Sequence, residues 1–350
     1  MNLKSLILLT TVCLAGSLSA QDEHFSQFYA LPMHMNPALT GAYEGTYRLS
    51  MVYRSQWGNA FDTPYKTVAA GGDTRLNMRI RKAKTKDHIG IGLFFINDEI
   101  AEFQASTNKL SGYAAYHKHL GEKRRSFLSA GIKLGIIQRN ITYGNLVFED
   151  QFNQVNEYSL PTGERLPPNN FGRMDLSTGI NYSVELDKSS VYLGVGYHHF
   201  TEPDFSFFNE LDPPPIGLDV SQKLDSKLVA HFSLDKKLNY EMALQPRIVY
   251  QKQGIHNQLD LGSNLEFTFK SRNTAVLFGL WLTAVDDLDG LDMENITPLI
   301  GVRQRQFVLG LSYDVHLRDT FQSPFGYNSF ELTLRFSGEH ENTGAYCPTF

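Results

Sequence analysis

The feature that most limits the fold of this chain is an alternation of apolar and polar residues that recurs from Thr46 to Phe336. It is clearest near the C-terminus, where the apolar positions are Phe330, Leu332, Leu334 and Phe336. The polar positions between them are Glu331, Thr333 and Arg335. Successive side chains of a β-strand point to opposite faces, so each such segment has one apolar and one polar face. The pattern predicts strands, with very little helix between them.

The alternation predicts fourteen strands, which is an even number. They are expected at 46–55, 65–81, 86–96, 106–120, 125–137, 171–186, 188–200, 227–235, 240–253, 257–270, 273–283, 295–303, 306–317 and 327–337. The connections should alternate in length. Short turns are expected at 82–85, 121–124, 187, 236–239, 271–272 and 304–305, and longer loops at 56–64, 97–105, 138–170, 201–226, 254–256, 284–294 and 318–326. This asymmetry is typical of outer-membrane barrels.

A soluble β-sandwich or a large lipocalin-like barrel would also produce alternation. Neither predicts the difference in loop length or so many long strands. The polar face carries isolated charges such as Asp175, Arg247 and Glu266 among many Gly and Ser, which suits a crowded lumen. We therefore predict an all-β fold, a 14-stranded antiparallel transmembrane outer-membrane β-barrel that spans 46–337.

Residues 1–20 have the pattern of a secretory signal peptide, with Lys4 before an apolar stretch and small residues at the end. Cleavage is expected after Ala20, with Ser19 as an alternative. Cys13 raises the alternative of a lipoprotein, but Thr10 stands where a lipobox requires Leu. The mature chain would contain a single cysteine, Cys347, and so no internal disulfide.

The segment 21–45 is rich in Met and aromatic residues but lacks the strand pattern. Fourteen strands enclose more space than eight, so the segment is expected to plug the lumen or to lie at the periplasmic mouth. Candidate docking residues are Phe25, Phe28, Tyr29, Asn36 and Pro37, of which Asn36-Pro37 would turn the chain into the barrel. An even strand count places both termini, including the tail 338–350, in the periplasm if the short turns are periplasmic.

Nothing in the sequence predicts a catalytic, cofactor or metal site. The sequence lacks GxSxG, HExxH, GxxxxGK[ST] and paired CxxC motifs. The net charge of −5 is modest and the basic residues are scattered, so nucleic acid is not an expected partner. We therefore expect a protein that is not an enzyme and that needs no cofactor.

Candidate partner-binding residues lie where the strands should meet the cell surface. Loops 138–170 and 201–226 contain several aromatics and prolines, and exposed aromatics often anchor partners. The alternative is that these loops fold inward and narrow the pore. The candidate anchors are Tyr53, Arg54 and Trp57 at the end of the first strand, with Phe205, Phe207 and Phe208 in the second loop. For the first strand, an interfacial aromatic belt is the alternative.

Two N-terminal motifs resemble a known family. The run Gln21 to Tyr29, followed by Asn36 to Gly41, is similar to the mature N-terminus of PorP/SprF proteins. These open with an aspartate, a Phe-Ser-Gln-aromatic run, and Asn-Pro-Ala before a glycine. Tyr53 to Trp57 and Thr63 to Thr67 resemble the family's first hairpin, whereas Glu23 replaces a common proline.

The resemblance implies an outer-membrane component of the type IX secretion system that acts in export or surface anchoring of secreted proteins, such as gliding adhesins. The implied partners are a secreted client with a C-terminal sorting domain, periplasmic lipoprotein or ring components of the system, and outer-membrane lipids. The alternative is a porin or a FadL-like outer-membrane transporter. FadL-type barrels also have 14 strands and an N-terminal plug, so architecture does not separate the two.

Overall fold

The computed structural model describes residues 22–43, 45–58, 63–77, 87–100, 104–121, 125–155, 157–164, 166–208, 222–269, 273–287, 290–317 and 328–339. The predictions for the signal peptide 1–20 and for most of the tail 338–350 lie outside these residues.

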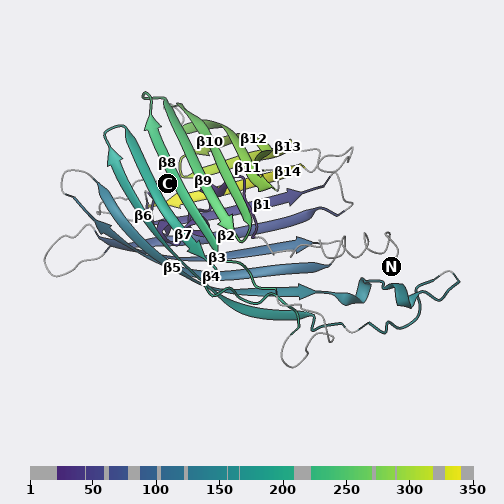
Figure 1. Ribbon diagram of the computed structural model, residues 1–350. Helices are drawn as coiled ribbons and strands as arrows, with labels where there is room; N and C mark the ends of the chain where they lie inside the picture. Colours follow the sequence, from purple (N-terminus) through teal and green to yellow (C-terminus); the bar gives the residue numbers. More distant parts are fainter. Residues whose placement is uncertain are drawn as a thin grey trace.

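Fourteen antiparallel strands form one closed barrel, in which each strand pairs with its neighbours in the sequence (Figure 1). They are β1 (Tyr47–Gln56), β2 (Tyr65–Asn77), β3 (His88–Ile100), β4 (Ala105–His119), β5 (Ser126–Ile141), β6 (Asn170–Leu186), β7 (Ser189–His198), β8 (Lys227–Lys237), β9 (Met242–Gln253), β10 (His256–Phe269), β11 (Thr274–Asp287), β12 (Gly290–Gln304), β13 (Phe307–His316) and β14 (Ser329–Gly338). The barrel closes where β1 pairs with β14, from Tyr47 opposite Gly338 to Gln56 opposite Ser329. The predicted fold class is confirmed.

The two ends of the barrel differ in their connections. At the short-turn end, only Asp187 and Lys188 separate β6 from β7, and only Arg305 and Gln306 separate β12 from β13. At the long-loop end, residues 142–169 join β5 to β6 and residues 199–226 join β7 to β8.

Three connections that we expected to be longer loops, 97–105, 254–256 and 284–294, are short. β3 and β4 extend until 101–104 alone lie between them, and Gly254 and Ile255 alone separate β9 from β10. Asp287 pairs with Gly290, so the β11–β12 hairpin also continues into the predicted loop. The backbone ladder continues here into polar residues that no longer alternate with apolar ones, so periodicity underestimated the strand lengths.

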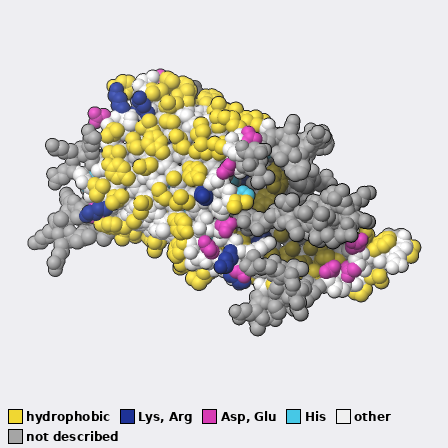
Figure 2. Space-filling model, in the orientation of Figure 1, with side chains coloured by type: hydrophobic (Ala, Val, Ile, Leu, Met, Phe, Trp, Pro, Cys, Tyr) yellow, Lys and Arg dark blue, Asp and Glu magenta, His cyan; other side chains and the backbone are white. Residues whose placement is uncertain are grey.

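The outer wall of the barrel is apolar, and the inner wall carries most of the polar side chains together with apolar patches. Figure 2 shows hydrophobic side chains over most of the wall, with charged side chains toward its ends. On β14, Leu334 is 43% exposed on the outside, whereas Glu331 and Thr333 are buried inside. Such an outer band matches the hydrocarbon layer that a transmembrane barrel contacts. No helix among the described residues has the length and apolar character needed to span a membrane.

Residues 22–43, which we call the luminal segment, lie inside the barrel. They form the short helices η1 (Phe28–Ala30), α2 (Pro32–Met35) and η2 (Pro37–Leu39). Two buried apolar clusters join them to the wall. The first contains Phe28, Met35, Leu39, Ala42, Phe127, Tyr192, Val229, Val249 and Trp281, and the second contains Phe25, Ala30, Leu31, Met33, Val52, Ala69, Phe94, Ile96 and Tyr113. The hydrophobic core of this protein therefore lies between the wall and the luminal segment.

The luminal segment runs along the barrel from one end to the other. Tyr47 begins β1 at the short-turn end. The Asp22 backbone N–H donates to Gln253 Oε1 at 3.1 Å, and Gln253 ends β9 at the long-loop end. We expected both termini on the same side, but Asp22 and the end of β14 lie at opposite ends of the barrel. An even strand count relates only the outer ends of β1 and β14, and the segment before β1 is long enough to traverse the lumen.

Candidate functional site

Glycines on the inner wall let the luminal segment approach the backbone of the strands. A Cβ at Gly131 of β5 would lie 2.4 Å from the Pro37 backbone, and one at Gly179 of β6 would lie 2.0 Å from Asn36 Oδ1. Both distances are shorter than any real Cβ contact, so a side chain at either position would displace η2. Asn36 itself accepts a hydrogen bond from the Ala38 N–H at 2.9 Å and donates to the Ile180 carbonyl at 3.0 Å. The Asn36-Pro37 turn is thus fitted to β5 and β6.

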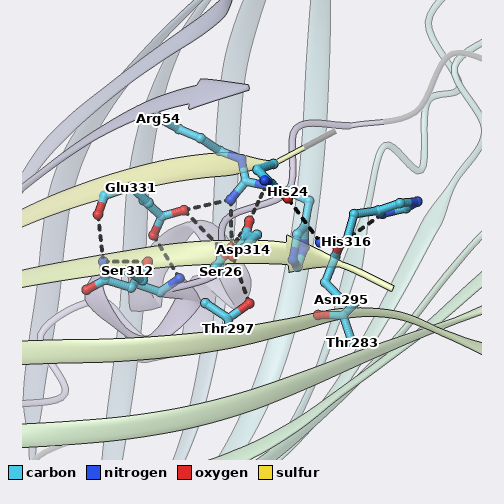
Figure 3. A network of polar contacts seen from close by, with 12 residues as sticks. His24, Ser26, Arg54, Thr283, Asn295, Thr297, Ser312, Asp314, His316 and Glu331 are labelled. Atoms are coloured by element: carbon cyan, nitrogen blue, oxygen red, sulfur yellow. Dashed lines mark hydrogen bonds and ion pairs between the residues drawn. The ribbon is translucent and has the colours of Figure 1, made fainter. Parts of the chain in front are cut away.

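A buried charge network holds Ser26 and Gln27 of the luminal segment to β1, β13 and β14 (Figure 3). Arg54 donates from Nη2 to Asp314 at 2.8 Å and from Nη1 to Glu331 at 3.0 Å. Arg54 Nη1 also donates to the Ser26 hydroxyl at 2.7 Å, and that hydroxyl donates to Asp314 at 2.7 Å. The backbone N–H groups of Ser26 and Gln27 donate to the two oxygens of Glu331 at 2.9 and 2.8 Å. The luminal segment therefore supplies part of the network rather than merely covering it.

The Arg54 network contains two carboxylates for one guanidinium. Burial of an uncompensated carboxylate is costly unless hydrogen-bond donors surround it. Here hydrogen bonds compensate the second negative charge. They come from the backbone N–H groups of Ser26 and Gln27 and from the hydroxyls of Ser26 and Thr297, of which the Thr297 hydroxyl donates to Asp314 at 2.7 Å. Removal of the luminal segment would take several of these donors away, so the segment and the network stabilise each other.

A second network holds the start of the luminal segment at the long-loop end. Lys109 Nζ lies 2.7 Å from both Asp22 and Glu23. His199 bridges two carboxylates, with Nε2 2.6 Å from Asp22 and Nδ1 2.8 Å from Asp175. Lys133 also contacts Asp175, at 2.6 Å. These contacts join the segment to β4, β6 and the residue that follows β7.

The ionisation of the second network follows from burial and neighbours. Burial opposes charge on Asp22, but His199 and Lys109 outweigh it and hold the pKa of its carboxyl well below the ordinary value. Burial likewise opposes charge on His199, but Asp22 and Asp175 raise the pKa of its imidazole. The pKa of His34 is lowered by burial and by nearby lysines. Asp22 and His199 are therefore held as an ion pair beside a neutral His34.

Arg54 is not an external anchor, contrary to our expectation. It is 5% exposed and faces the lumen, because it shares the face of Arg48, Ser50 and Val52 in β1. Tyr53 points outward and is half-buried on the barrel wall. Trp57 follows the end of β1, is 38% exposed, and lies with its ring centre 5.9 Å from that of Tyr65.

The aromatics of the 199–226 loop are less exposed than expected. Phe205 is buried with Ile137 and Leu224, so it is not available to a partner. Phe207 and Phe208 are half-buried, and Phe207 packs edge-on against Phe171 at 4.9 Å. The described part of this loop folds inward onto Ile137 and Phe171, as the alternative predicted, whereas narrowing of the pore stays a prediction.

Several exposed apolar side chains at the long-loop end lie on residues 142–169, which we call the β5–β6 arm. In Figure 1 the arm, drawn in teal, extends well beyond the barrel. Its exposed apolar side chains are Val147, Phe152, Val155, Tyr158 and Leu160. The sequence places aromatics here as it does in 201–226, so composition alone did not distinguish the two loops.

The arm has its own internal structure. It contains the short helices η4 (Tyr143–Asn145) and η5 (Glu149–Gln151), and Phe152 pairs with Tyr158 across a narrow bridge. The two rings are 5.1 Å apart, and the Asp150 carboxylate accepts hydrogen bonds from the Gly163 N–H and the Thr162 hydroxyl. The arm thus presents apolar side chains in a fixed arrangement. Across the described ranges, His, Cys, Asp and Glu form no group of three suited to a metal ion.

A comparison with known protein families shows to which family the chain belongs. A family described as "Type IX secretion system membrane protein PorP/SprF" matches residues 17–336. The chain belongs to the PorP/SprF family. The resemblance of the N-terminal motifs is confirmed, and the protein is a membrane component of the type IX secretion system. No curated protein matches this PorP/SprF sequence.

Solved structures with a similar barrel include two toluene transporters. The toluene transporter TbuX of Ralstonia pickettii is 10% identical, with a TM-score of 0.49, and the match covers 88% of this chain and 93% of TbuX. The toluene transporter TodX of Pseudomonas putida is 9% identical, with a TM-score of 0.49 and coverage of 92% and 96%. At these values, neither similarity bears on what this PorP/SprF protein binds.

The Arg54 network gives a first prediction. The variant Arg54→Met leaves Asp314 and Glu331 without their cation, and loss of one partner from a buried pair costs about 3–5 kcal/mol. The barrel ladder is untouched, so the cost should appear as release of the luminal segment. Amide hydrogen exchange should show reduced protection in residues 25–43 and unchanged protection in the strands.

Arg125→Met is the matched control, because Arg125 forms an exposed pair with Glu185 at 3.4 Å and such pairs contribute little. Arg54→Met combined with Glu331→Gln should partly restore protection. Equal protection of residues 25–43 in the Arg54→Met and Arg125→Met variants would show that the network does not hold the segment.

The Asp22–His199 pair gives a pH prediction. His199 has a raised pKa, so its contribution is complete below its ordinary value of 6.5 and is lost as the pH rises through the raised pKa. Asp22 has a lowered pKa, so its contribution is complete above 3.8 and is lost as the pH falls through the lowered pKa. Protection factors of residues 22–26 should therefore be highest between about pH 4 and 6.5 and fall at alkaline pH.

His199→Gln should remove the alkaline fall in protection, whereas His256→Gln, at the same end of the barrel, should retain it. Protection factors that stay flat between about pH 5 and 9 in the unmodified protein would refute the role of this pair.

Proposed function

We propose that this protein acts in the outer membrane as a non-enzymatic part of the type IX secretion system that holds a secreted client at its long-loop end. In this proposal the long-loop end faces the cell surface and the short-turn end faces the periplasm. The client carries a C-terminal sorting domain, and the periplasmic partners are lipoprotein or ring components of the system.

The observation that carries the proposal is the occupied lumen. The luminal segment contacts most strands of the wall through two apolar clusters and two buried charge networks. A barrel filled in this way is suited to act through its surfaces rather than as an open passage for a folded protein or for solutes. This argues against an open porin, whereas a plugged FadL-like transporter would also have an occupied lumen.

The β5–β6 arm supports binding at the long-loop end. Soluble surfaces rarely keep several large apolar side chains exposed unless they bind something. Val155 is 81% exposed and Tyr158 is 55% exposed on a segment that projects from the barrel wall. Because hydrogen bonds already fix the arm, a client would bind it with a small loss of conformational entropy. The arm replaces Arg54 and Phe205 as the proposed client-binding surface, whereas Trp57 stays a candidate at the rim.

The test is the double variant Phe152→Ala with Tyr158→Ala. Binding energy concentrates in a few aromatic anchors that each contribute about 2 kcal/mol or more, so the client should leave the surface or fail to be exported. Quantitative mass spectrometry of the surface and medium fractions measures proteins with C-terminal sorting domains. The barrel should still assemble, because neither residue belongs to a strand of the wall.

Leu238→Ala is the matched control, because Leu238 is 44% exposed, lies in the β8–β9 turn at the opposite end and does not line a cavity there. The control should leave the client in place. If the double variant also leaves the client in place while barrel abundance is normal, the arm is not the client-binding surface.

A further inference from the structure

A cavity of about 410 Å³ lies beside the luminal segment at the short-turn end. Gln27 and Tyr29 of the luminal segment form one side, and the inner wall from β8 to β14 forms the other. The turn residues Asp187, Lys188 and Tyr240 surround its mouth. We call this space the vestibule. Its volume lies within the range of pockets that hold ligands, about 300–1,000 Å³.

Three arginines line the vestibule, and two of them lie close to a carboxylate. Arg303 pairs with Glu266. Arg247 lies 3.5 Å from Asp235 and 4.8 Å from the centre of the Tyr29 ring. Arg335 of β14 lines the same space, but within the described ranges no carboxylate lies at ion-pair distance from it.

The surroundings of Arg335 have an excess of positive charge. Arg48 and Arg247 repel its guanidinium, and the attraction of Asp235 offsets this repulsion only in part. Arg48 is already neutralised by Asp73, to which it donates at 2.9 and 2.7 Å. Asp73 pairs with Arg48, Asp235 with Arg247 and Glu266 with Arg303. Within the part of the chain that the structure describes, Arg335 therefore has no carboxylate at ion-pair distance. An unneutralised guanidinium in a confined space is an energetic cost that an incoming anion would remove.

We propose that the vestibule binds a carboxylate-bearing peptide segment, which enters at the short-turn end and pairs with Arg335. A guanidinium fork fits the two oxygens of a carboxylate. The vestibule is larger than a single small anion needs, and Leu277, Leu299 and the Tyr29 ring offer apolar wall for the residues beside the acidic one. A short acidic and apolar peptide satisfies both features. The inference goes beyond the client at the long-loop end and does not depend on it.

The experiment uses the full-length protein in detergent, in a Trp57→Phe background, so that Trp281 is the one remaining tryptophan. Trp281 stacks on Tyr29 with ring centres 5.5 Å apart, so its fluorescence should respond to a ligand in the vestibule. The probes are acetyl-Leu-Glu-Leu-amide and its neutral isostere acetyl-Leu-Gln-Leu-amide. The acidic peptide should bind at least tenfold more tightly, which corresponds to about 1.4 kcal/mol.

Arg335→Gln should weaken the acidic peptide at least tenfold, and Arg335→Lys should weaken it less. Arg305→Gln is the matched control, because Arg305 is exposed in the β12–β13 turn at the same end but does not line the vestibule. It should change affinity by less than about twofold, or less than about 0.4 kcal/mol.

The comparison of the two peptides on the unmodified barrel does not depend on how any Arg335 variant folds. Equal affinity for the two peptides, or no effect of Arg335→Gln in a barrel that folds normally, would overturn the proposal. Inorganic phosphate is the third probe. Tight binding of phosphate without binding of the acidic peptide would identify a site for small anions only and would also overturn the assignment.

Discussion

A closed barrel of fourteen strands encloses more space than its inward side chains fill, and the rest of this structure depends on how that space is occupied. The luminal segment fills it and brings the apolar core of the protein inside the barrel. Because the inner wall carries most of the polar side chains, apolar packing alone would leave buried charges without partners. The Arg54 network resolves this, since Ser26 and Gln27 donate to the same carboxylates that Arg54 neutralises.

The two ends of the lumen differ in how their charged side chains are paired. At the long-loop end, Asp22 and Glu23 of the luminal segment meet Lys109 and His199 of the wall. At the short-turn end the segment supplies no carboxylate, and Arg335 faces the vestibule without one. The segment therefore pairs its carboxylates with the wall at one end and, among the described residues, leaves an unpaired arginine beside an open space at the other.

The strands were predictable from the sequence because one side chain in two must face lipid, which makes the alternation strong. The same alternation applied to β1 would have placed Arg54 inside with Arg48. Because Arg54 lies near the end of the strand, we expected it at the rim instead. Its partner Glu331 is 277 residues away, and no local pattern reveals such a pair. Likewise, Phe205 and Phe152 lie in loops of similar composition. Only the path of the chain buries Phe205 beneath Leu224 and leaves Phe152 exposed.

We infer that the luminal segment blocks passage through the lumen. Single-channel conductance in planar bilayers tests this inference without intermediate steps. The intact protein should insert without a steady conductance, and a variant that lacks residues 22–43 should form an open pore of the same barrel. A large, steady conductance from the intact protein would contradict the account and would favour a porin.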